Sequence, residues 1–113
     1  MNPEVKKLWV EALRGGKYVQ GKGKLHYISK DGQEKFCCLG VLCDLYPGAE
    51  WEYEDGIVGV MEGNSGTLTE AVRAWAGLNN SDPFVSGIDC LSGINDDRGC
   101  SFDAIADLIE DQL

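Results

Sequence analysis

Residues 25–46, LHYISKDGQEKFCCLGVLCDLY, decide the fold. Two short apolar runs flank Asp31-Gly32, a dipeptide typical of the two-residue turn of a β-hairpin. We therefore expect strands on either side of it, at about residues 25–29 and 34–38. A helix formed by residues 38–46 would have little polar face, which indicates that it is short and buried on all sides. The Pro-Gly pair that follows is expected to end this helix.

The turn signal repeats further along the chain. Residues 51–61, WEYEDGIVGVM, carry Asp55-Gly56 between two short runs of strand-forming residues, which predicts a second hairpin. FVSGI at residues 84–88 indicates a short strand, and DCLSGI at residues 89–94 indicates one helical turn.

Apolar residues at helical spacing predict three further helices. The first begins at Pro3 behind the cap residue Asn2 and ends at the glycines 15 and 16. The next is capped by Thr67 or Thr69 and ends at the glycine at 77, and the last is capped by Ser101. Together these elements predict a single compact α+β domain over residues 1–113, in which a small antiparallel sheet from two hairpins packs with three to four short helices.

Charge divides the chain unevenly, although the net charge is −9. Residues 1–36 hold eight Lys and Arg against four acids, a net charge of +4, whereas residues 37–113 hold two Arg against fifteen acids, a net charge of −13. The overall charge argues against nonspecific binding to nucleic acid. No apolar run reaches the length of a membrane span and the amphipathic start is not a secretory signal, so we expect a cytoplasmic protein without membrane contact.

The cysteines and the histidine, which could act in catalysis or bind a metal, do not form a convincing pattern for either role. The cysteines are odd in number, which disfavours a disulfide framework, and they are expected to be buried; they stand at positions 37, 38, 43, 90 and 100. Zinc bound by His26 with Cys37, Cys38 or Cys43 is the alternative, but no CxxC pair is present. A catalytic Cys38 would need His26 as its base. We therefore predict a non-enzyme with no metal and no cofactor.

A glycine-rich basic segment is the main candidate for a binding site. Residues 14–25, RGGKYVQGKGKL, hold four basic side chains and four glycines. Glycines let backbone N–H groups approach a phosphate, lysines add positive charge, an aromatic ring stacks on a base, and an amide reads a base edge. On these grounds the predicted ligand-binding residues are Lys17, Tyr18, Gln20, Gly21, Lys22 and Lys24, joined by Trp51 and Arg73. The alternative is a solvated turn that only joins a helix to a hairpin.

Three blocks of sequence resemble, in order, a family of small proteins encoded by tailed phages and prophages. The blocks are K-Y-x-Q-G-x-G at residues 17–23, C-C-L-G-V-L-C-D at residues 37–44, and N-D-x-G-x-S-F-x-x-I-A at residues 95–106, the last with one extra residue before its glycine. The resemblance implies that the protein is encoded by a phage and is located in the cytoplasm of an infected bacterial host. It does not imply any particular reaction.

Phage proteins of this size often counter host defence. By analogy with sponges, which bind immune signals such as cyclic dinucleotides without cleaving them, we expect this protein to sequester a small anionic, nucleotide-derived ligand and to form a homo-oligomer. The alternative is an acidic protein–protein inhibitor that mimics DNA and occupies a host defence enzyme. A phosphodiesterase that cleaves such signals is the weakest hypothesis.

Overall fold

The hairpin at Asp31-Gly32 forms as predicted in the structure, a computed structural model that describes residues 1–85 and 89–113. Strand β1 (His26–Ile28) pairs antiparallel with β2 (Glu34–Phe36). Gly32 has a φ of +82°, a left-handed conformation that glycine adopts at little cost. Both strands are shorter than predicted, since Cys37 already caps the next helix with its thiol.

The second predicted hairpin is also present. It consists of β3 (Glu52–Glu54) and β4 (Val58–Val60), and the turn residues Asp55 and Gly56 have φ values of +52° and +70°. Two successive positive φ angles are the mark of the type I′ turn that suits a tight hairpin. Because β4 also pairs with β1, the two hairpins form one antiparallel sheet in the order β2-β1-β4-β3. This confirms the predicted sheet.

The described residues form five helices, one more than the three to four that the sequence predicts. The predicted caps Asn2, Thr69 and Ser101 each accept backbone hydrogen bonds at a helix start. The extra helix arises because the single turn predicted near residue 91 extends to six residues. The helices are α1 (Pro3–Arg14), α2 (Cys38–Leu45), α3 (Glu70–Ala76), α4 (Leu91–Asp96) and α5 (Phe102–Gln112).

A second, two-stranded sheet precedes α4. It pairs β5 (Phe84–Val85) with β6 (Asp89–Cys90). The strand predicted at residues 84–88 is therefore present at its start, while residues 86–88 lie outside the described residues. The helix predicted to begin at residue 89 begins two residues later, because residues 89 and 90 form β6 instead.

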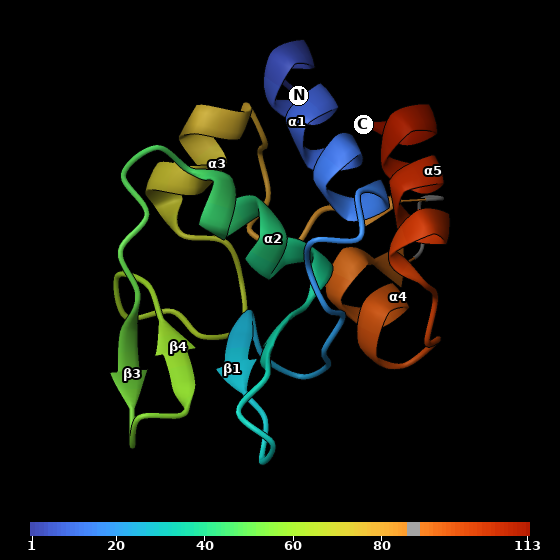
Figure 1. The fold of residues 1–113 in the computed structure, drawn as a ribbon. Helices are drawn as coiled ribbons and strands as arrows, with labels where there is room; N and C mark the ends of the chain where they lie inside the picture. The colour runs from blue at the N-terminus through green and yellow to red at the C-terminus, as the bar shows by residue number, and fades with distance from the viewer. Residues whose placement is uncertain (86–88) are drawn as a thin grey trace.

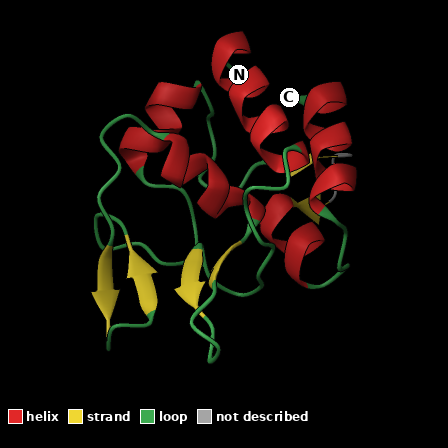
Figure 2. Ribbon diagram, in the orientation of Figure 1, coloured by secondary structure: helices red, strands yellow, loops and turns green. Residues whose placement is uncertain are grey.

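Helix α2 occupies the centre of the molecule, between the four-stranded sheet and the remaining helices (Figures 1 and 2). Its residues 38–43 are buried, as the apolar sequence predicted. Gly40 allows the close approach of the preceding hairpin, because a Cβ at this position would lie 1.7 Å from the carbonyl oxygen of Leu25. On the other side, the buried Trp9 of α1 donates its indole N–H to the Cys38 carbonyl at 2.9 Å.

Candidate functional site

The three sequence blocks meet around Asn95, which is fully buried at the end of α4. Its side-chain amide donates to the Gly21 carbonyl at 2.8 Å, and its Oδ1 accepts from Gln20 Nε2 at 2.9 Å and from the Cys38 backbone N–H at 3.3 Å. This side chain of α4 thus joins the segment after α1 to the start of α2.

Gln20 completes this buried network. Its Nε2 also donates to the Cys100 carbonyl at 2.7 Å, and its Oε1 accepts from the backbone N–H of Phe102 at the start of α5 at 3.1 Å. The amide predicted to read a base edge is therefore engaged with the protein itself. The structure gives Gln20 the role of holding three elements together.

Gly21 is buried as well, and packing explains why a glycine stands there. A Cβ at this position would lie 2.7 Å from Tyr27 Cε1 and 2.9 Å from Lys35 Cβ. The Gly21 N–H donates to the Phe36 carbonyl at 2.7 Å, which adds residues 19–21 to the outer edge of β2. Gly21 was predicted to approach a phosphate, but its backbone N–H faces the sheet.

The lysines of the segment remain on the surface. Lys17, Lys22 and Lys24 are all exposed, and none of the ion pairs within residues 1–85 and 89–113 uses them. The Lys22 side chain extends to the loop before α5. A Cβ built at Gly99, in that loop, would lie 3.6 Å from Lys22 Nζ. The three lysines thus place exposed positive charge on one irregular segment.

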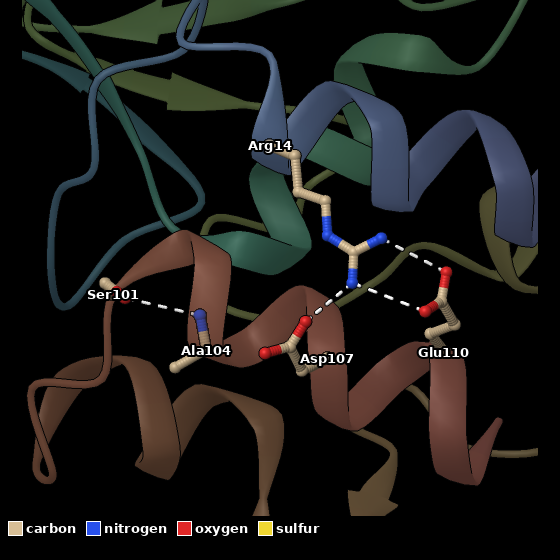
Figure 3. A network of polar contacts seen from close by, with 5 residues as sticks. All are labelled: Arg14, Ser101, Ala104, Asp107 and Glu110. Carbon is tan, nitrogen blue, oxygen red and sulfur yellow. Dashed lines mark hydrogen bonds and ion pairs between the residues drawn. The ribbon is translucent and has the colours of Figure 1, made fainter.

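Arg14, at the start of the same segment, has a structural role instead. Its guanidinium crosses from α1 to α5, where it pairs with Asp107 at 2.6 Å and Glu110 at 3.1 Å (Figure 3). These hydrogen bonds to the two carboxylates raise the pKa of Arg14. Figure 3 also shows the predicted cap of α5, in which Ser101 Oγ accepts from the Ala104 N–H at 3.2 Å.

A cleft of about 390 Å³ opens beside the lysine segment, between β2 and α2. We call it the Tyr18–Asp44 cleft; its lining residues are Lys17, Tyr18, Val19, Glu34, Phe36 and Asp44. The Tyr18 hydroxyl donates to Asp44 Oδ2 at 2.7 Å, and the Trp51 indole N–H donates to Asp44 Oδ1 at 3.0 Å. The two aromatic residues predicted to stack on a base are therefore attached to one carboxylate at this cleft.

Aromatic rings continue from the cleft across the sheet. Tyr18 meets Phe36 edge-on with centroids 5.0 Å apart, and Phe36 stacks on His26 at 4.2 Å with an interplanar angle of 11°. His26 then contacts Trp51 at 5.1 Å. Burial and the hydrogen bond to the nearby carboxylate raise the pKa of Tyr18, so its hydroxyl stays protonated at neutral pH.

His26 is fully buried in this cluster, and both its ring nitrogens are engaged. Nδ1 lies 3.0 Å from the Lys35 carbonyl, which only accepts, so Nδ1 carries a proton. Nε2 lies 3.0 Å from the Tyr53 hydroxyl. Glu34 Oε1 lies 3.5 Å from the same nitrogen. Neither ring nitrogen is left for a metal or for a cysteine.

The cysteines of α2 are buried, as predicted. Burial raises the pKa of Cys37 to about 11 and that of Cys38 well above its ordinary value. The position of Cys38 at the helix start therefore does not lower the pKa of its thiol, whose Sγ lies 3.6 Å from the Leu91 carbonyl. In the part of the chain that the structure describes, no three His, Cys, Asp or Glu side chains gather as a metal site requires.

Arg73 is not brought to the cleft. It lies on α3, on the opposite side of α2 from the segment that follows α1 (Figure 1). Its Nη1 donates to the Asn79 carbonyl at 2.9 Å, a contact that stabilises the end of its own helix. Of the predicted binding residues, Lys17 and Tyr18 thus line the cleft, and Trp51 is bonded to its lining residue Asp44. Lys22 and Lys24 lie on the same segment as Lys17, and the remaining three, Gln20, Gly21 and Arg73, are in structural positions.

The sequence matches one family model along its whole length. The chain belongs to the family described as Domain of unknown function (DUF8296), which covers residues 1–113. Neither a search of curated proteins nor a search of solved structures found a match. Among the helices of the described residues, none has both the length and the apolar character needed to cross a membrane.

Proposed function

We propose that this protein binds a small anionic, nucleotide-like signal at the Tyr18–Asp44 cleft and sequesters it without cleaving it. The observation that carries the proposal is the composition of the cleft: a lysine, an aromatic ring and two carboxylate acceptors around a volume of about 390 Å³. This volume lies within the range of about 300–1,000 Å³ typical of small-molecule sites. An aromatic ring for the base and a cation for the phosphate are what a nucleotide needs.

The charge distribution supports the entry of an anion at this place. A protein with a net charge of −9 repels anionic ligands over most of its surface. Lys17, Lys22 and Lys24 are exposed on one segment, and Lys17 belongs to the cleft wall. Its ammonium lies 5.5 Å from the centroid of the Tyr18 ring, so positive charge and stacking surface are adjacent.

The state of the nearby nucleophiles supports binding rather than cleavage. The raised pKa of Tyr18 keeps its hydroxyl neutral and bound to Asp44. The thiols of α2 are buried, and burial raises their pKa values. Groups in these protonation states are poor nucleophiles.

The resemblance to phage and prophage proteins supplies the biological context of the proposal. The protein would act in the cytoplasm of an infected bacterium and remove a nucleotide immune signal from the host defence system. We expect it to act as a homo-oligomer, in which a second copy covers the open side of the cleft.

Thermal-shift screening of the full chain against cyclic dinucleotides, cyclic ADP-ribose isomers and ordinary nucleotides tests the proposal. A ligand that binds only the folded state adds about 2.7 kcal/mol at a hundredfold excess over its Kd. Lys17→Glu should abolish the shift, whereas Lys30→Glu, on the exposed turn of the first hairpin, should preserve it. The ligand recovered after heating should be chemically intact. No shift with any compound would contradict the proposal.

A second candidate function rests on the β3–β4 hairpin. Its exposed residues combine three acids, Glu52, Glu54 and Asp55, with Tyr53 and Ile57, whose exposed fractions are 41% and 51%. Strand β3 is also the free edge of the sheet. This favours the DNA-mimic inhibitor, in which an acidic surface binds a basic groove of a defence nuclease. The double variant Glu52→Lys, Glu54→Lys should then abolish inhibition of DNA cleavage, and Lys17→Glu should not.

A further inference from the structure

The two carboxyl groups of the Tyr18–Asp44 cleft differ in the number of hydrogen bonds that their oxygens already accept. Both oxygens of Asp44 accept a hydrogen bond, one from Tyr18 and one from Trp51. Glu34 has no such donor among the side chains of residues 1–85 and 89–113, and its side chain is 63% exposed. Glu34 therefore keeps the capacity to accept hydrogen bonds from a bound molecule.

The closest polar neighbour of Glu34 is His26, whose Nε2 lies 3.5 Å from Glu34 Oε1. Each ring nitrogen of His26 has a nearer partner, because Nε2 lies 3.0 Å from the Tyr53 hydroxyl and Nδ1 lies 3.0 Å from the Lys35 carbonyl. The contact with His26 therefore leaves most of the carboxylate of Glu34 open to a bound molecule.

The position of Glu34 is set by the hairpin. Glu34 and Phe36 are two residues apart on β2, so their side chains leave the strand on the same face. The Phe36 ring is held between Tyr18 and His26 and lines the same cleft. Glu34 thus places a carboxyl group at the rim of an aromatic site.

A carboxylate at this point selects what part of a nucleotide faces it. It repels a phosphate and a base edge that carries lone pairs, and it attracts an edge that carries N–H groups. Guanine is the one common base whose Watson–Crick edge has two adjacent donors, N1–H and the N2 amino group. The spacing of these donors matches the two oxygens of a carboxylate. Adenine turns a lone pair on N1 toward the same position.

We propose that Glu34 binds the Watson–Crick edge of a guanine base, so that the sequestered ligand is a guanine nucleotide whose phosphate is attracted to Lys17. This inference rests on the proposed function and names the ligand class of the same cleft. Tyr18 supplies the stacking surface, and Glu34 provides the specificity.

The experiment compares the affinity of the full chain for GMP, IMP and AMP, and for cyclic di-GMP and cyclic di-AMP, by isothermal titration calorimetry. A hydrogen bond to a charged group corresponds to a difference of about tenfold or more in Kd. GMP should therefore bind about tenfold more tightly than AMP, with IMP, which lacks the N2 amino group, in between. Cyclic di-GMP should likewise bind more tightly than cyclic di-AMP.

Glu34→Gln separates recognition from folding. An amide offers one acceptor and one donor, so the variant should lose the preference for guanine and keep its affinity for AMP. Glu11→Gln, the same change at an exposed position on α1, should leave the preference intact. Equal binding of guanine and adenine nucleotides by the wild-type protein would overturn the inference and leave the proposed function standing. An equal loss of affinity for all nucleotides in Glu34→Gln would also overturn it. Absence of binding by all five compounds would overturn the inference, and the thermal-shift screen with the cyclic ADP-ribose isomers would then decide whether the proposed function stands.

Discussion

Replacement of Asn95 by alanine should destabilise the fold more than any other single polar substitution near the cleft. The side chain is fully buried and makes hydrogen bonds to Gly21 O, Gln20 Nε2 and Cys38 N. Gln20 keeps a second partner, so the substitution leaves two buried backbone groups without one, the Gly21 carbonyl and the Cys38 N–H. Each such group costs about 1–3 kcal/mol, so the loss should be about 2–6 kcal/mol.

Urea unfolding followed by far-UV circular dichroism measures this loss. Domains of this size unfold with a free energy of about 5–15 kcal/mol, so the shift in midpoint should be large. Asn79→Ala, at an exposed position after α3, is the matched control and should change stability by less than about 0.5 kcal/mol. The reasoning would be refuted if the urea midpoint of Asn95→Ala equalled that of the control variant within experimental error. The double variant with Gln20→Ala should lose less than the sum of the two single losses, because the two side chains share one network.

Two further predictions concern the buried helix α2. Gly40→Ala should prevent stable folding, since its Cβ would lie 1.7 Å from the Leu25 carbonyl oxygen and overpacking costs about 1–3 kcal/mol or more; a variant as stable as the wild type would contradict this. Alkaline pH should also destabilise the protein, because burial raises the pKa of Cys37 from 9.0 to about 11 and the folded state retains a proton that the unfolded state releases. This stabilisation is fully present below about pH 9 and is lost as pH rises through 11, so urea midpoints should fall over that window and the fall should be smaller in Cys37→Ala.

The local features of the fold were predictable because short-range chemistry determines them. Gly32 in the first hairpin and Asp55-Gly56 in the second hairpin adopt positive φ angles that few other residues accept, and these angles favour the turns. The caps Asn2, Thr69 and Ser101 satisfy N–H groups within three residues along the chain. These signals need no information about distant parts of the sequence.

The long-range contacts at and beside the cleft were not predictable in the same way. Gln20 and Asn95 are 75 residues apart in the sequence, and Tyr18 and Asp44 are 26 residues apart. A glutamine beside lysines has the same local sequence pattern whether it binds a ligand or a buried asparagine. Only the packing of α4 against the segment after α1 decides between these roles, and no periodicity in the sequence encodes that packing.

The position of Glu34 at the cleft was also missed by sequence reasoning. It stands two residues after the turn of a hairpin and resembles an ordinary solvated acid. Its importance appears only when Phe36, Tyr18 and Asp44 are seen to form a cleft around it. The one available signal was the alternation along β2, which places residues 34 and 36 on the same face.

The most direct test of ligand binding at the cleft uses two tryptophan indole N–H signals in a ¹H–¹⁵N NMR titration. Trp51 donates to Asp44 at the cleft, whereas Trp9 donates to the Cys38 carbonyl in the core. On addition of cyclic di-GMP to the full chain, the Trp51 indole signal should move with increasing ligand and the Trp9 signal should remain in place. A titration in which the Trp51 signal does not move, or in which both signals move to the same extent, would contradict binding at the Tyr18–Asp44 cleft.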